Sequence, residues 1–143
     1  MSEYQDFLVD ELKSKFESKI AKKQILDKVQ QSINTQVQSL EIKLKSVIEA
    51  TDDYIIINKN QSAQRFAGIK IADQEIIFKR QKDCIEIYRS QKNEDEDQDQ
   101  ELHLIDKLIP KQTSCISEFT KKVFTLNQYN AYLKSVFHNL LLD

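Results

Sequence analysis

Two cysteines and two histidines are the residues in this chain best suited to chemistry, and they lie far apart in the sequence. Cys84, Cys115, His103 and His138 form no close pair of the kind that zinc sites use. His103 stands near Asp106, but no nucleophile stands with them. A reactive thiol needs a nearby base that lowers its pKa, and neither cysteine has one beside it. We therefore predict no catalytic, cofactor-binding or metal-ligating residue, and a protein that is not an enzyme.

A group of lysines is the other pattern that could bind a ligand. Lys15, Lys19, Lys22 and Lys23 concentrate positive charge in one short stretch, and residues four apart, such as Lys15 and Lys19, share a helix face. Acidic residues interleave with them, which favours a solvated face with local ion pairs. The alternative is a set of phosphate contacts for a nucleotide or nucleic acid. The chain has a single glycine, Gly68, so no glycine-rich phosphate loop supports this alternative.

Negative charge is concentrated in residues 90–101, a segment without any apolar residue. Its acidic residues are Glu94, Asp95, Glu96, Asp97, Asp99 and Glu101. Setting these six charges aside from the net charge of −2 leaves +4 for the rest of the chain. The segment lacks the glycine and the distal glutamate of a calcium loop. We expect a solvated acidic loop, and a chain without the clustered basic face typical of nucleic-acid binding.

Composition and the first residues suggest where the protein resides. The chain is 40% hydrophobic and 31% charged, which is typical of a globular domain in water. Its first residues are polar and acidic rather than those of a signal peptide, and no stretch approaches a membrane span. We expect a cytoplasmic protein with no membrane partner. Its richness in Lys, Ile, Asn and Gln suggests an AT-rich bacterial or phage genome.

The first 53 residues hold no glycine or proline and predict a long helical arm. Tyr4, Leu8, Leu12, Phe16 and Ile20 are spaced four apart, so their stripe drifts about 40° per step around a helix of period 3.6. A second stripe, about 100° wide, follows and does not stay in line with the first. We expect helices over about 3–20 and 24–51 with a break in 21–24, or one continuous helix. The second stripe gives the candidate interface residues: Leu26, Val29, Ile33, Val37, Leu40 and Leu44.

In residues 54–89 the sequence pattern changes from that of a helix to that of β-strands. Segments 54–58, 65–72, 75–80 and 84–89 are rich in Ile, Phe and Tyr, and short polar connections of hairpin length separate them. Gly68 inside a strand suggests a bulge or a close approach by another backbone. The pattern predicts an antiparallel meander of three to five strands, with an apolar face that the helical arm covers.

The sequence pattern of residues 102–143 predicts a definite secondary structure only near the C-terminal end. Residues 102–109 form either a fifth strand or a short helix that ends before Pro110, and 113–122 are ambiguous. From Asn127, which we expect to cap a helix, apolar residues recur at helical spacing. We predict a C-terminal helix docked on the body of the protein.

These elements make one α+β domain over residues 1–143, with a helical arm (1–53), a β-meander (54–89), an acidic loop (90–101) and a C-terminal part (102–143). A helix of 28 residues is about 42 Å long, whereas a four-stranded sheet is only about 15–20 Å wide. The surplus apolar surface favours a small non-enzymatic interaction or regulatory protein that binds a second copy of itself, or another protein, through its helices. A nucleotide- or nucleic-acid-binding module, such as a phage or host regulator or inhibitor, is the alternative, although we do not expect nucleic acid as the main partner.

Overall fold

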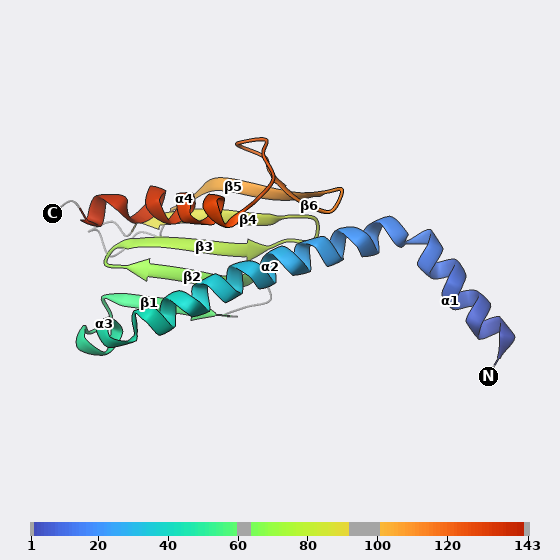
Figure 1. The fold of residues 1–143 in the computed structure, drawn as a ribbon, viewed down its shortest axis with the longest axis horizontal. Helices are drawn as coiled ribbons and strands as arrows, with labels where there is room; N and C mark the ends of the chain where they lie inside the picture. Colours follow the sequence, from blue (N-terminus) through green and yellow to red (C-terminus); the bar gives the residue numbers. More distant parts are fainter. Residues whose placement is uncertain (1, 60–63, 92–100, 142–143) are drawn as a thin grey trace.

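A computed structural model describes residues 2–59, 64–91 and 101–141 of the chain (Figure 1). The fold is α+β, as predicted: long N-terminal helices, an antiparallel sheet and a C-terminal helix. The helices are α1 (Glu3–Lys15), α2 (Glu17–Lys43), α3 (Lys45–Ala50), α4 (Leu126–Phe137) and a final 3₁₀ turn, η1 (His138–Leu141). The strands are β1 (Ile55–Lys59), β2 (Arg65–Ile71), β3 (Gln74–Arg80), β4 (Ile85–Gln91), β5 (Leu102–Lys111) and β6 (Ser114–Ser117).

The six described strands form one antiparallel meander in the order β1-β2-β3-β4-β5-β6, so each strand pairs with its neighbours in sequence. The predicted count of three to five was too low, because β6 was not recognised; β5 is the fifth strand that the sequence allowed. Pro110 does not end β5, since it lies beyond Leu108, the last residue of β5 that pairs with β4. A proline there removes no hydrogen bond from the β4–β5 ladder.

Three local predictions need correction. Ser90 and Gln91 belong to β4 rather than to the acidic loop, and Ser90 is buried; residues 92–100 of that loop lie outside the described part of the chain. The β-bulge of β2 falls between Arg65 and Ala67, not at Gly68. The N-cap position of α4 is Thr125 rather than Asn127, so the helix begins two residues earlier than a cap at Asn127 would place it.

The helical arm bends at Phe16, not within 21–24. Phe16 takes φ −107° and ψ 16°, and a second break at Leu44 (φ −95°, ψ 5°) separates α2 from α3. The backbone N–H of Phe16 still bonds to the carbonyl of Leu12 at 3.1 Å, so the chain turns there without losing the helix. Residues 17–24 contain neither glycine nor proline, and α2 therefore continues through the position where the second apolar stripe begins.

Helices α2 and α4 pack on the same face of the sheet and enclose the core (Figure 1). Alternate residues of the strands point toward these helices, as the two-residue period of a strand requires. From α2 the core receives Leu26, Val29, Ile33 and Val37, and from α4 Tyr129, Tyr132, Val136 and Phe137. The sheet contributes Phe66, Ile69, Ile76, Phe78, Ile85, Ile87, Leu108 and Cys115, among others.

A buried carboxylate ties α4 to strand β5. Asp106 of β5 is 1% exposed, and it accepts hydrogen bonds from the hydroxyls of Ser117, at 2.6 Å, and Tyr132. It also accepts one from the backbone N–H of Lys107 at 2.7 Å. Burial, followed by the hydrogen bond to Asp106, raises the pKa of Tyr132, so the phenol stays a donor. A carboxylate can be buried in this way because its oxygens are satisfied.

The two buried tyrosines of α4 provide a matched test of this network. Tyr132→Phe removes a donor from a buried carboxylate, and we expect it to lower the free energy of unfolding by about 1.5–3 kcal/mol. The hydroxyl of Tyr129 is buried without a partner among the described residues, so Tyr129→Phe should leave stability within about 0.5 kcal/mol or raise it. Urea unfolding of both variants measures the difference. Equal losses in the two variants would contradict the assigned role of Asp106.

Candidate functional site

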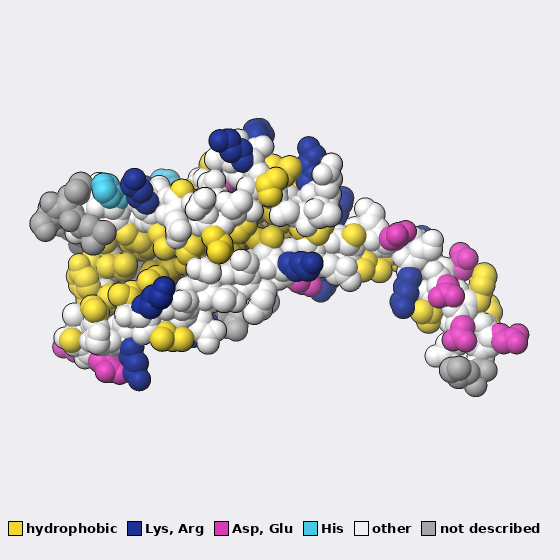
Figure 2. Space-filling view, in the orientation of Figure 1, with side chains coloured by type: hydrophobic (Ala, Val, Ile, Leu, Met, Phe, Trp, Pro, Cys, Tyr) yellow, Lys and Arg dark blue, Asp and Glu magenta, His cyan; other side chains and the backbone are white. Residues whose placement is uncertain are grey.

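The N-terminal part of the chain has a large apolar surface that the described residues leave uncovered. Every residue from 2 to 24 is exposed, and α1 contains no buried residue. We call residues 3–24 the overhang, because they extend beyond the sheet (Figure 1). Its exposed large apolar side chains are Tyr4, Phe7, Leu8, Val9, Leu12, Phe16 and Ile20, which are 39% to 70% exposed. Figure 2 shows apolar side chains along this projection.

The residues proposed from the sequence as an interface lie elsewhere. Leu26, Val29, Ile33 and Val37 are buried against the chain's own sheet, and Leu40 and Leu44 are half-buried. The stripe of α2 therefore covers the sheet of its own molecule along most of its length, because α2 runs across that sheet. The surplus apolar surface exists, but it precedes this stripe and lies on the overhang.

Charge is distributed unevenly along the overhang. Its first half is acidic, with Glu3, Asp6, Asp10 and Glu11. Its second half is basic, with Lys13, Lys15, Lys19, Lys22 and Lys23 against the single acid Glu17. The figure shows acidic side chains gathered toward the tip of α1 (Figure 2). The overhang thus carries an apolar stripe, and its charge changes from negative in the first half to positive in the second.

A basic cleft lies where the overhang meets the body, between α2 and the turn that joins β3 to β4. Its volume is about 710 Å³. Three of the four predicted phosphate-contact lysines line it, namely Lys19, Lys22 and Lys23. Lys15 does not line it, and its ammonium lies 5.6 Å from the ring centre of Phe16 instead. The other lining residues are Asp27, Gln30, Arg80, Gln81, Lys82 and Asp83.

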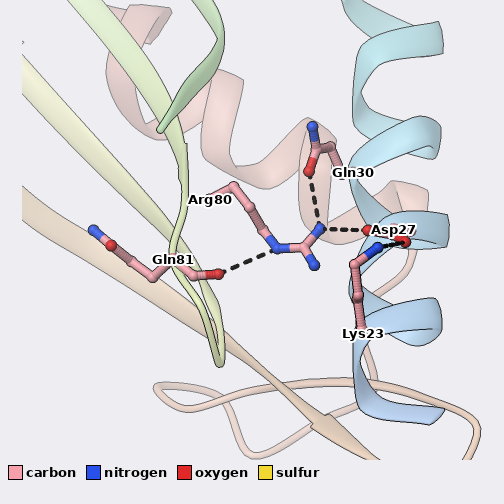
Figure 3. A network of polar contacts seen from close by, with 5 residues as sticks. All are labelled: Lys23, Asp27, Gln30, Arg80 and Gln81. Atoms are coloured by element: carbon pink, nitrogen blue, oxygen red, sulfur yellow. Dashed lines mark hydrogen bonds and ion pairs between the residues drawn. The ribbon is translucent and has the colours of Figure 1, made fainter. Parts of the chain in front are cut away.

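Arg80 anchors the wall of this cleft (Figure 3). Its Nη1 lies 3.0 Å from Oδ1 of Asp27 and 3.0 Å from Oε1 of Gln30, while its Nε donates to the backbone oxygen of Gln81 at 3.2 Å. The Arg80 side chain is only 15% exposed. Lys23 bonds to Asp27 from the other side at 2.9 Å, and Lys23 and Arg80 together lower the pKa of this carboxyl. The sequence analysis missed Arg80 and Lys82, because nothing in the spacing pairs a strand end with a distant helix.

The cleft has an excess of positive charge. Five cationic side chains line it, against the two carboxylates of Asp27 and Asp83, and Asp27 already pairs with two of the cations. No lining residue is aromatic or aliphatic. Such a wall can attract an anion but offers no aromatic ring on which a nucleotide base could stack.

No protein-family model, curated protein or solved structure matches the chain. What the protein does must therefore be argued from its own surfaces.

The fold does not bring together the two cysteines and two histidines that were considered from the sequence as chemically reactive residues. Cys84 and Cys115 are buried as unpaired thiols. His103 is exposed beside Glu101, with 3.7 Å between Nε2 and Oε2, whereas Asp106 turns into the core. Across residues 2–59, 64–91 and 101–141, no three His, Cys, Asp or Glu side chains gather in a group able to hold a metal ion. In the same part of the chain, each helix is too short or too polar to span a bilayer; a cytoplasmic location stays a prediction.

The burial of both thiols predicts low reactivity. Burial raises the pKa of Cys84, and it raises the pKa of Cys115 to about 11. Because the pKa of each thiol is raised, each cysteine is protonated at pH 8 in the folded protein. The reactive form is the thiolate, so both cysteines should react slowly. We expect an aromatic disulfide reagent to label neither thiol rapidly at pH 8, and to label both once guanidinium unfolds the chain. Rapid labelling of the native protein would contradict the buried placement.

Proposed function

We propose that the protein is a non-enzymatic interaction protein that associates with a second copy of itself through the overhang, and that this association serves a regulatory role. The observation that carries the proposal is the combination of complete exposure and large apolar side chains on α1. Single exposed apolar residues are ordinary on protein surfaces, but a contiguous apolar patch is typical of an interaction site.

The stability of α1 supports the same proposal. An isolated helix shorter than about 12–15 residues is marginal in water, because most helix stability in proteins comes from packing of an apolar face. Helix α1 has 13 residues and buries none of them. Its apolar stripe therefore needs another surface to pack against. The core of its own molecule is closed by α2 and α4 and offers the stripe no such surface among the described residues.

Charge complementarity favours a second copy of the chain as the occupant. An acidic partner would repel the first half of the overhang, and a basic partner would repel the second half. A second overhang supplies both an acidic and a basic half. Identical surfaces related by a twofold axis make the commonest kind of homodimer.

Light scattering tests the association. At micromolar concentration we expect a mass near twice the chain mass of 16.8 kDa. Leu12→Glu places a charge in the apolar stripe at two symmetric positions, so it should shift the mass toward the monomer. Because none of the residues of α1 is buried in the described structure, the β-sheet signal in circular dichroism should persist.

Ser14→Glu is the matched control, since it adds the same charge to α1 away from the stripe. It should retain the dimer mass. A parent protein that keeps a mass near 16.8 kDa over a hundredfold dilution series would refute self-association.

A second candidate function, binding of a phosphate-bearing ligand, is favoured by the basic cleft. Its volume of about 710 Å³ lies within the range of small-molecule sites. The five cations would contact phosphate groups, and the wall without apolar residues favours recognition of the phosphates rather than of a base. This candidate corresponds to the nucleotide- or nucleic-acid-binding alternative predicted from the sequence.

Lys82 gives a clean test of the second candidate, because it lines the cleft but lies outside the overhang. We expect a fluorescent oligothymidylate to bind with salt-dependent affinity, and inorganic tripolyphosphate to compete with it. Lys82→Glu should weaken binding at least fivefold and reduce the salt slope by roughly 0.7–1, as for the loss of one phosphate contact. Lys45→Glu, an exposed lysine on α3, is the control. Equal loss in both variants would show a nonspecific charge effect and would exclude the cleft as the site.

A further inference from the structure

The four-residue spacing of the overhang has a symmetry that specifies how two copies can meet. Tyr4, Leu8, Leu12, Phe16 and Ile20 are evenly spaced, and Leu12 is the central member. If two such helices lie antiparallel with Leu12 opposite Leu12, then Leu8 faces the partner's Phe16. The three central apolar residues of the stripe then meet one another, which is the self-complementary arrangement that a twofold axis requires.

A second row of residues, one position before each member of the stripe, sets the direction of the pair. This row, the flanking row, is Glu3, Phe7, Glu11, Lys15 and Lys19. It shares the spacing of the stripe, so it follows one side of the stripe along the whole overhang. Its charges change sign once, between Glu11 and Lys15.

The flanking row distinguishes the two possible directions. In an antiparallel pair the same side of each helix meets, so Glu11 lies beside the partner's Lys15. In a parallel pair related by a twofold axis, the two flanking rows would lie on opposite sides of the contact. Glu11 and Lys15 could then not pair, and the acidic halves of the two overhangs would lie together at an energetic cost. We propose that the α1 helices of two copies pair antiparallel around a twofold axis at Leu12, with Glu11 of each helix beside Lys15 of the other. This inference rests on the proposed self-association.

The position of the body is compatible with this arrangement. The first residue of α2 buried in the core is Leu26, which lies 14 residues after Leu12 and beyond the bend at Phe16. An antiparallel pair therefore places the two sheets at opposite ends of the helical contact. The drift of about 40° per step limits continuous packing, so Leu8, Leu12 and Phe16 carry most of the contact.

Disulfide trapping tests the direction and register. The native thiols are buried, so the parent protein should give no crosslink under mild oxidation. Leu12→Cys places two thiols at the twofold axis and should form a crosslinked dimer. Leu8→Cys should not crosslink to itself, because its two copies lie about 12 Å apart along the axis, beyond the usual Cα separation of about 4.4–6.8 Å. A mixture of Leu8→Cys and Phe16→Cys chains should form the crosslinked heterodimer.

The outcomes separate this inference from the proposed function. A monomeric parent protein in light scattering overturns both. A dimeric parent in which Leu8→Cys crosslinks efficiently to itself retains self-association but overturns the antiparallel register. A dimer in which none of these positions crosslinks also overturns it. Each cysteine variant is checked by light scattering before oxidation, and a variant that no longer dimerises is replaced by the charge test below.

A charge reversal gives independent evidence without altering the apolar stripe. Glu11→Lys should weaken the dimer roughly tenfold, because the lost contact with the partner's Lys15 occurs twice. Asp10→Lys makes the same charge change on the side of the helix away from the stripe and should change the dissociation constant less than twofold. Added salt should weaken the parent dimer and reduce the difference between the two variants. Equal effects of the two substitutions would overturn the pairing of the flanking rows.

Discussion

The structure depends on one requirement, which is that the apolar face of a six-stranded sheet must be covered by helices. Two helices meet it, and they come from opposite ends of the chain. Because α2 covers the sheet from Leu26 onward, its position determines where the N-terminal helices leave the body. The overhang is thus a consequence of core packing: α2 continues past the edge of the sheet, and α1 has no sheet beneath it.

Periodicity in the sequence was sufficient for the class of fold and for most elements, since helices of period 3.6 and strands of period 2 are local properties. It could not say which surface each apolar stripe would cover. Leu26, Val29, Ile33 and Val37 have the same pattern whether they meet a sheet or a second chain, and only the tertiary structure assigns them to the core. The strand β6 was missed for a related reason: four residues are too few to show a period, and its pairing with β5 stabilises it.

The basic cleft illustrates a different limit. Its helical lysines were visible as a cluster, but Arg80 and Lys82 come from a hairpin more than fifty residues away. The hydrogen bonds of Arg80 to Asp27 and Gln30 both close the edge of the core and shape the cleft wall. The overhang and the cleft share Lys19, Lys22 and Lys23, so a change of charge at these lysines would bear on both proposed functions.

The order of the elements along the chain also bears on synthesis. Each strand pairs with its neighbour in sequence, so the meander can form hairpin by hairpin as it leaves the ribosome, with little loss of chain entropy. Helix α4 is made after every strand, however, and it supplies Tyr129, Tyr132, Val136 and Phe137 to the core. Until it emerges, the nascent sheet exposes Phe78 and its neighbours to water, a state in which partly folded chains aggregate or recruit chaperones.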